Sequence, residues 1–229
     1  MPLLTFDCLS AGHRETRTLD ATNLVLAGWT GRDHAALQHH IDELAALGVP
    51  PPTSVPTYYR TSVELVVQTG RLQVLGPHTS GEVEYVLLPF ADGLWFTVGS
   101  DQTDRKAETM GVALSKQLAG KVLAREAWKL SEWADRWDSL TIRAHAVIDG
   151  KRVVYQDATL GDIRPPAELV AGCSGGAAML AAGTVMMSGT PPAIGGIRAA
   201  SRFEMEIADP ASSAAIRHGY DIEVLPVVV

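Results

Sequence analysis

Short runs of apolar, β-branched and aromatic residues recur along most of the chain, and Gly, Pro, Asp or Asn bounds most of them. This is the pattern of short β-strands separated by turns. It predicts strands at residues 3–9, 22–28, 71–76, 83–90, 94–99, 140–148, 151–156, 202–208 and 222–229. Strand signals therefore outnumber helix signals, and we expect a β-rich fold.

Helical spacing of apolar residues is clear in fewer places. In residues 32–48, leucines and an isoleucine recur at helical spacing and stop before Gly48, a helix-stop residue. Segments 103–120 and 166–172 are two further candidate helices, and the proline-rich segment 48–56 fits only an extended connector. Because strands and helices do not alternate regularly, we expect an α+β fold and not a doubly wound parallel sheet.

The composition limits the classes of protein that fit this pattern. With 229 residues the chain can bury a proper core, and we expect a single domain over residues 1–229. Lys and Arg number 19 against 26 for Asp and Glu, a net charge of −7, which lacks the basic excess that nucleic acids demand. The most apolar stretch, residues 177–192, is shorter than the roughly 20 residues that span a bilayer. We therefore expect neither nucleic acid nor a membrane as a partner.

The two cysteines, Cys8 and Cys173, are too few for a disulfide framework. The first residues, MPLLTFDCLSAG, lack the basic and apolar regions of a secretory signal. Both observations favour a reduced, cytoplasmic protein.

Residues 81–105, GEVEYVLLPFADGLWFTVGSDQTDR, read as a β-hairpin with carboxylates gathered at one end. The dipeptide Asp92-Gly93 is a signal for a two-residue turn, which fixes the register of the two strands. Counting outward from that turn places Asp101 opposite Glu84. The hairpin is therefore expected to bring carboxylates of both strands together.

Glu82 precedes Glu84 by two residues and points to the same side of the strand, so three carboxylates converge on one face. Opposed like charges destabilise a sheet, and the arrangement needs a compensating cation, either Lys or Arg or a bound metal. Oxygen-only ligands select a hard ion such as Mg²⁺ or Mn²⁺. The alternative is a solvated strand end where the carboxylates splay apart.

Six segments resemble, in sequence order, signature segments of the fumarylacetoacetate hydrolase superfamily. That family typically shows E-x-E, then Y-T-x-x-N-D-x-S-A-R-D, then G-D-x-x-x-T-G-T-P-x-G-V-G. The segments here are GWTGRDHAAL, TYYRTS, GEVEYVLLP, FTVGSDQTDR, the stretch at residues 140–171 and MSGTPPAIGG. The chain is most similar to an uncharacterised branch of the superfamily.

The resemblance implies a fold, a cofactor and a class of reaction. The implied fold is an α+β, β-rich mixed β-roll or barrel-like domain with a few flanking helices, in a homodimer. The implied enzyme uses Mg²⁺ or Mn²⁺ on a small carboxylate substrate, a 2-oxo acid or 1,3-dicarbonyl compound, and hydrolyses a carbon–carbon bond through a metal-bound enolate. A hydratase, decarboxylase or tautomerase of a related oxo acid is the alternative. A non-catalytic binding protein that kept the fold is a second alternative.

The metal and the reacting oxygen are assigned by the same resemblance. Glu82, Glu84 and Asp101 match the three carboxylates that hold the divalent ion in the family. Lys116 resembles the lysine that approaches the polarised oxygen of the substrate, although it follows the metal aspartate more closely than is usual. The alternative for Lys116 is an exposed helix residue.

Four residues match positions that bind substrate in the family, namely Arg60, Arg105, Gln156 and Thr190. Arg60 replaces the usual lysine, which points to a substrate with a further carboxylate. The alternatives are a simple pair with Asp104 for Arg105 and a solvated strand end for Gln156.

His34 matches the histidine that activates water on a lid segment of the hydrolases, helped by a glutamate one helical turn later. Leu37 stands at the position of that glutamate here. Asp33, Glu43 or a residue from elsewhere could replace the missing carboxylate, or this branch does not hydrolyse at all.

Overall fold

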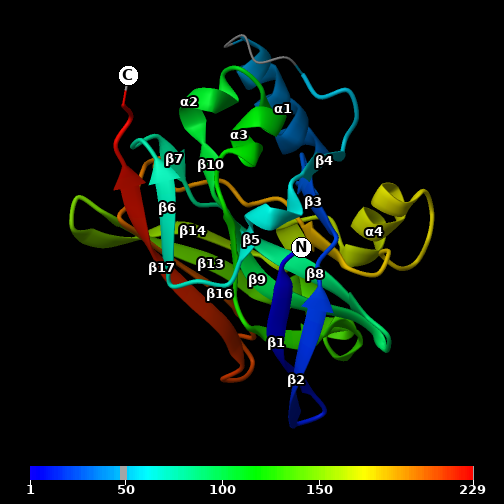
Figure 1. Cartoon of the computed structure of the whole chain (residues 1–229). Helices are drawn as coiled ribbons and strands as arrows, with labels where there is room; N and C mark the ends of the chain where they lie inside the picture. Colours follow the sequence, from blue (N-terminus) through cyan, green and yellow to red (C-terminus); the bar gives the residue numbers. More distant parts are fainter. Residues whose placement is uncertain (47–50, 229) are drawn as a thin grey trace.

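The computed structural model describes residues 1–46 and 51–228, and two β-sheets dominate it (Figure 1). The strands are β1 (Leu3–Ser10), β2 (His13–Asp20), β3 (Asn23–Gly28), β4 (Thr57–Thr61), β5 (Val66–Val67), β6 (Arg71–Leu75), β7 (Thr79–Ser80), β8 (Val83–Phe90), β9 (Gly93–Asp101), β10 (Thr103–Asp104), β11 (Lys121–Leu123), β12 (Glu126–Lys129), β13 (Thr141–Ile148), β14 (Lys151–Thr159), β15 (Thr184–Met187), β16 (Arg202–Ala208) and β17 (Ala215–Leu225). The helices are α1 (His34–Ala46), α2 (Arg105–Glu108), α3 (Val112–Gln117) and α4 (Pro166–Ser174), with 3₁₀ turns at Val63–Leu65, Leu130–Glu132, Ala134–Ser139 and Leu160–Asp162.

The larger sheet contains ten strands, eight of them in the order β2-β1-β12-β9-β8-β15-β3-β4, while β11 pairs with β9 and β5. Parallel and antiparallel pairs are mixed, since β1 pairs with β12 and β3 with β15 in parallel, whereas β8 and β9 are antiparallel. Within the described chain β2 and β4 remain edges, so the sheet is not a closed barrel. The predicted β-rich α+β class with a mixed sheet is confirmed.

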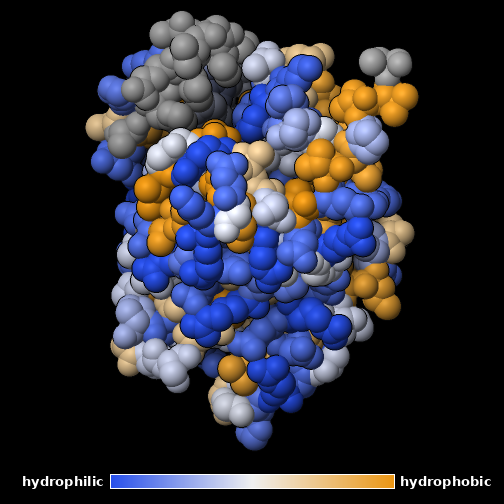
Figure 2. Space-filling model, turned by 90° about the vertical axis from the view of Figure 1, so that its left-hand side faces the viewer, coloured by the Kyte–Doolittle hydropathy of each residue, from blue (hydrophilic) through white to orange (hydrophobic). Residues whose placement is uncertain are grey.

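The smaller sheet has the order β14-β13-β16-β17-β6 and packs against the hairpin of β8 and β9. We call the cluster between the two sheets the inter-sheet core; it includes Val83, Tyr85, Leu87, Phe96, Val98, Ile142, Phe203 and Met205. The side of the molecule where β17 and β6 lie is largely hydrophilic (Figure 2). Ion pairs between neighbouring strands supply part of this polarity, for example Arg202–Asp221 at 2.8 Å.

A second cluster lies on the other face of the large sheet, and we call it the inner core. It includes Phe6, Cys8, Leu24, Leu26, Val86, Leu88, Trp95, Leu123, Val185 and Met187. These side chains come from strands far apart in the order of one sheet, so the sheet must curl around them. The two cores thus share the β8–β9 hairpin, whose alternate residues point to opposite faces.

Helices form in all three predicted segments, but α1 begins later than predicted and segment 103–120 is divided into two helices. Helix α1 begins at His34, and Asp33 caps it by accepting a hydrogen bond from the Ala35 N–H at 2.9 Å. Its predicted end, Gly48, and the start of the connector at 48–56 lie outside the described residues. Segment 103–120 forms two short helices, α2 and α3, because the chain turns at Gly111 between them. No helix within the described ranges is both long and apolar enough to cross a membrane.

The predicted register of the hairpin is wrong by two residues. Phe90 pairs with Gly93, so the turn is formed by Ala91 and Asp92 instead of Asp92 and Gly93. Gly93 takes the positive φ of +125° just after the turn, and the Asp92 carboxylate accepts a hydrogen bond from the Trp95 indole at 3.1 Å. The strand residue opposite Asp101 is therefore not Glu84, which pairs with Gly99.

The slip leaves the faces of the strands unchanged. Side chains alternate with a period of two, so a shift of two residues returns each one to its own face. Asp101 now lies beside Glu82, and its N–H donates to the Glu82 carbonyl at 3.0 Å. The convergence of the carboxylates survives although the pairing that predicted it does not.

Candidate metal centre and active site

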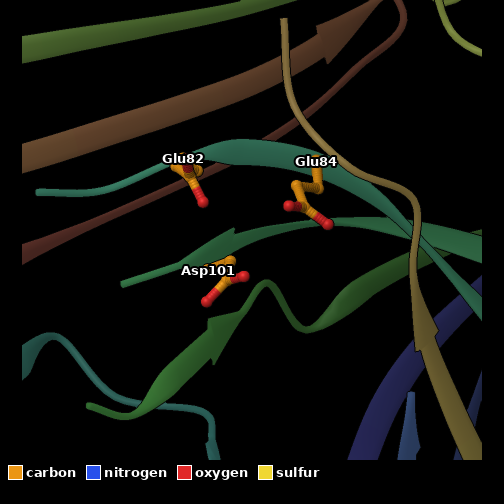
Figure 3. Close-up of side chains that lie close together, drawn as sticks. All are labelled: Glu82, Glu84 and Asp101. Carbon is orange, nitrogen blue, oxygen red and sulfur yellow. The ribbon is translucent and has the colours of Figure 1, made fainter. Parts of the chain in front are cut away.

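Glu82, Glu84 and Asp101 lie together at the end of the β8–β9 hairpin, on the face of the inner core (Figure 3). One oxygen of each lies within 4.8 Å of the others. Glu84 and Asp101 are almost inaccessible, with 1% and 0% of their surface exposed, while Glu82 keeps a partly exposed side chain. Continued alternation from Val86 and Leu88 explains why the carboxylates share this face.

Three cations of the chain itself surround the carboxylates. Lys116 on α3 donates to Asp101 Oδ2 and lies 3.4 Å from Glu82 Oε2. Lys121 at the start of β11 lies 2.7 Å from Asp101 Oδ1 and donates to the Gln102 carbonyl at 2.7 Å. Arg105 at the start of α2 donates to Glu82 Oε1 at 2.8 Å. Three positive groups thus face three carboxyl groups.

Burial and these charges set the protonation of the site. Burial, and then the charge of Asp101, raise the pKa of Glu84 well above its usual range. Burial alone would also raise the pKa of Asp101, but the charges of Lys116 and Lys121 outweigh it and hold that pKa at about 2. The same balance, with burial overcome by Asp101 and Glu82, raises the pKa of the Lys116 ammonium. The pair of Asp101 and Lys116 is therefore ionised at neutral pH.

Glu84 is held by the loop that follows β15. The Gly189 N–H donates to Glu84 Oε2 at 2.8 Å. Gly189 has φ +84°, and a Cβ there would lie 2.2 Å from Thr30 Oγ1 and 3.0 Å from the Ala27 carbonyl. Only glycine therefore lets the backbone approach Glu84 in this way.

Gln156 and Thr190, both predicted to bind substrate, hold that loop on β8. Gln156 is buried, and its amide donates to Thr190 Oγ1 at 2.6 Å and to the Pro191 carbonyl at 2.5 Å. Its oxygen accepts from the Val83 N–H at 3.0 Å, and the Thr190 hydroxyl donates to the Val83 carbonyl at 2.9 Å. These contacts give both residues a positioning role beside Glu84.

Arg105 reaches the candidate site, but it does not pair with Asp104. Its guanidinium bridges Glu82 and Glu108, the latter at 3.0 Å, and its Nε donates to Ser80 Oγ at 2.7 Å. Asp104 instead caps α2 through the N–H groups of the first turn. Arg105 thus fixes the direction of Glu82.

Two predicted site residues lie apart from the carboxylates. Arg60 is exposed on edge strand β4 opposite Val25, whose side chain belongs to the inter-sheet core, and it donates to Asn23 Oδ1 at 2.5 Å. His34 is exposed at the first residue of α1. The contacts recorded for the described residues join neither side chain to the three carboxylates.

Lys121 is the site residue that the sequence interpretation missed. It is fully buried, and β11 pairs antiparallel with β9 so that Lys121 lies directly opposite Asp101. A usable signal was present, because Lys121 opens the apolar run VLA in a chain whose three converging carboxylates require positive partners.

The donor set fits a divalent cation of the hard class. Three carboxylates offer oxygen ligands only, and oxygen ligands in small numbers, completed by water, are what Mg²⁺ and Mn²⁺ accept. The lysines and Arg105 offset the same carboxylates, so the triad is compatible with a metal without depending on one for charge balance. The candidate centre therefore combines metal ligands with ammonium groups.

Three solved structures share the fold over most of their length. A yeast fumarylacetoacetate hydrolase family protein is 14% identical with a TM-score of 0.63, over 91% of this chain and 96% of that chain. A Burkholderia cenocepacia protein proposed to be a fumarylpyruvate hydrolase is 15% identical with a TM-score of 0.63, over 99% and 97%. A 2-keto-3-deoxy-D-arabinonate dehydratase complexed with magnesium and 2,5-dioxopentanoate is 14% identical with a TM-score of 0.64, over 93% and 77%.

These likenesses show that the fold is that of the fumarylacetoacetate hydrolase superfamily, as the sequence resemblance implied. The chain belongs to the family described as protein of unknown function DUF2848, whose model matches residues 27–220. A search of curated proteins gave no significant match. The chain is thus a member of the DUF2848 family with the fold of the fumarylacetoacetate hydrolase superfamily.

Proposed function

We propose that this protein is a divalent-metal-dependent enzyme that hydrolyses a carbon–carbon bond of a 2-oxo acid or 1,3-dicarbonyl compound. The observation that carries the proposal is the buried group of Glu82, Glu84 and Asp101 with two lysines in contact with it. The structures of similar fold are named for enzymes of oxo acids, and one of them is complexed with magnesium.

The three carboxylates would hold Mg²⁺ or Mn²⁺, which would supply a Lewis acid for a carbonyl oxygen. Residues of the chain would donate protons, position the ligands and accept a proton. Lys116 would donate to an oxygen of the substrate that gains negative charge. Arg105 fixes Glu82, and Gln156 and Thr190 fix the loop that bonds Glu84. His34 would take a proton from the attacking water.

A lyase or isomerase of a related oxo acid is the second candidate, and the position of His34 favours it. His34 is exposed, and the helix residue one turn later is Leu37 and not an acid. The proton-carrying side chains that contact the carboxylates include two lysines and Arg105. Dehydration, decarboxylation and tautomerisation need proton transfer but no activated water.

A substrate screen combined with one substitution tests the proposal. Acylpyruvates, 2-oxo acids and hydroxy-dienoates should be assayed with Mg²⁺, with Mn²⁺ and with EDTA, and turnover should require the metal. On the best substrate, His34→Ala should lower kcat by about 10² to 10⁴, the usual contribution of a general base. His13→Ala, at an exposed histidine of β2, is the matched control and should not change kcat.

The outcomes separate the candidates. Full turnover by His34→Ala without release of the two carboxylic acids that hydrolysis of an acylpyruvate gives would overturn hydrolysis through His34 and support the lyase or isomerase. Metal binding without turnover of any substrate class would instead support a binding protein that kept the fold.

A further inference from the structure

We propose that the Lys116 ammonium and the divalent cation compete for the same carboxylate oxygens, so that metal binding displaces Lys116 from those oxygens until a substrate is bound. The inference rests on the proposed function, because it concerns the metal site of that enzyme. It assigns to Lys116 a part in metal loading that is separate from any contact with substrate.

The contacts of Lys116 overlap with those that the ion would need. Its ammonium donates to Asp101 Oδ2 and lies 3.4 Å from Glu82 Oε2, so it bridges two of the three candidate ligands. Its positive group therefore occupies the space between two carboxylates. A cation held by Asp101 and Glu82 would therefore meet a like charge at the oxygens it requires.

The other two cations are anchored by contacts outside the triad. Lys121 is fully buried and donates to the Gln102 carbonyl as well as contacting Asp101 Oδ1. Arg105 is bonded to Ser80 and Glu108 in addition to Glu82. Among residues 1–46 and 51–228, the ammonium of Lys116 forms ion pairs with Glu82 and Asp101 alone. Lys116 is thus the cation that can leave without breaking other bonds.

Helix α3, which carries Lys116, is built so that it can shift. It spans only Val112–Gln117, with Gly111 before it and Gly120 shortly after it. One face buries Ser115 and Lys116, whereas Leu114 and Leu118 are 42% and 51% exposed. In Figure 1, α2 and α3 lie together beside the end of the hairpin that carries the carboxylates. A short, weakly covered helix is the least costly element to move.

The net charge of the site also favours displacement of Lys116 when the metal binds. Glu82, Glu84, Asp101 and Glu108 face Lys116, Lys121 and Arg105, so the group carries one negative charge when all of them are ionised. Addition of a divalent ion would leave a surplus of one positive charge in a buried site. Such a surplus is costly in a low-dielectric environment unless one cation withdraws or the substrate brings negative charge.

The test begins with the affinity for Mn²⁺, the probe ion, in the intact protein and in Lys116→Gln. A ligand that binds only a minor state has its apparent affinity reduced by the fraction of that state, and minor states are commonly about 0.1 to 10%. Lys116→Gln should therefore bind Mn²⁺ at least about tenfold more tightly than the wild type. Lys106→Gln, at an exposed lysine of α2, is the matched control and should bind as the wild type does.

A second measurement needs no variant and detects the displacement itself. Lysines of the wild type are labelled briefly with acetic anhydride, in EDTA and in saturating Mg²⁺, and quantified by peptide mass spectrometry. Lys116, which is 8% exposed, should label several-fold faster with Mg²⁺, while Lys106 should not change. This arm separates displacement from mere repulsion, because an ammonium that stayed beside the ion would remain protected.

Equal Mn²⁺ affinities of wild type and Lys116→Gln, or unchanged labelling of Lys116 in Mg²⁺, would overturn the inference and leave the proposed function intact. Absence of Mn²⁺ binding by both proteins would overturn the metal-dependent function and the competition with it. Binding by Lys116→Gln alone would support the competition while showing that the wild type works without the ion.

Discussion

The two faces of the β8–β9 hairpin differ in a way that separates folding from chemistry. The face toward the inter-sheet core is apolar over most of its length, with Val83, Tyr85, Leu87, Phe96 and Val98. Its last residue on β9 is Ser100, a neutral side chain that accepts a hydrogen bond from the Tyr220 hydroxyl at 2.8 Å. The face toward the inner core begins in the same way, with Val86, Leu88 and Trp95, and then ends in Glu84, Glu82 and Asp101. The same two strands therefore support an uncharged core on one side and a charged centre on the other.

The difference shows what each side needs from the rest of the chain. The apolar face requires only a second layer, because burial of apolar surface stabilises it without direction. The charged end requires specific partners, and α2, α3 and β11 each contribute one cation there. Loss of one partner should therefore matter most where the groups are charged and buried.

The largest change in stability is expected from Asp101→Asn. It would leave Lys121 fully buried and Lys116 nearly so without their shared carboxylate, which costs about 3–5 kcal/mol when a buried pair is broken. Urea unfolding of both proteins in EDTA measures the loss. Asp157→Asn breaks an exposed pair with Arg143 as a control and should cost less than about 1 kcal/mol. Equal losses for the two variants would contradict this view of the charged end.

On the apolar face, Leu87→Ala should lower the free energy of unfolding by about 2–5 kcal/mol through lost burial and the cavity left behind. Leu87 points away from the carboxylates, so Mn²⁺ affinity should stay as in the wild type when it is measured by titration. A fall in Mn²⁺ affinity comparable to that of Asp101→Asn would show that the two faces are not independent.

Glu84→Gln should have the opposite effects to Leu87→Ala. We expect little loss of stability and a large loss of metal binding. The pKa of Glu84 is raised by burial and by Asp101, so a neutral amide of the same shape resembles its protonated form, and its oxygen can still accept from Gly189. We expect less than about 1 kcal/mol in urea unfolding. Mn²⁺ titration should show much weaker binding, and undiminished affinity would remove Glu84 from the ligand set.

The smallest effect is expected at the turn end of the hairpin, where Asp92 is partly exposed. Hydrogen bonds from Arg17, and then from Lys129 and Trp95, lower the pKa of Asp92. A lowered pKa in the folded state adds stability that is fully present above the ordinary pKa of about 3.9, decreases as the pH falls below that value and is lost only as the pH passes through the lowered pKa. Asp92→Asn should therefore cost at most about 1 kcal/mol at pH 7 and progressively less toward pH 2. Thermal unfolding across this range checks the sign, and a cost that grows toward low pH would contradict it.

The convergence of the carboxylates could be predicted, whereas the register could not. Alternation along a strand assigns faces from the sequence alone, and a slip of two residues preserves them. The choice between two overlapping turns depends on contacts from elsewhere in the chain. Asp92 bonds Arg17 of β2 and Lys129 of β12, and neither contact can be read from the hairpin itself.

Strands β2 and β15 were not predicted from the sequence. As with the register of the hairpin, contacts from elsewhere in the chain determine them. Strand β2, HRETRTLD, has little apolar pattern because it is an edge strand with exposed side chains, held in part by charged contacts such as that of Arg14 with Glu126. Strand β15, TVMM, is short and buried throughout, and it pairs in parallel with β3, far away in the sequence. Periodicity identifies half-buried strands, and it fails both for strands with mostly exposed side chains and for strands that are buried on both faces.

The sequence resemblance located Lys116 but not Lys121, and it aligned Arg60 with a site that lies on the other face of the sheet. The apolar run after Lys121 indicates that this lysine is buried, but its place opposite Asp101 follows from the pairing of β11 with β9. The position of Arg60 follows from the pairing of β4 with β3, which no local pattern fixes. Motifs thus assigned the residues within the hairpin better than those brought to it by pairing.

The contact between Gly189 and Glu84 offers a means of sorting unexamined sequences of this kind. Any residue with a side chain at position 189 would collide with Thr30 and remove the backbone donor, so the acid and the glycine must be inherited as a pair. Sequences that keep both residues should keep the carboxylate centre. Sequences that lose the glycine should show varied residues at the position of Glu84. Two alignment columns, from opposite halves of the chain, would then divide the family into members with the carboxylate centre and members without it.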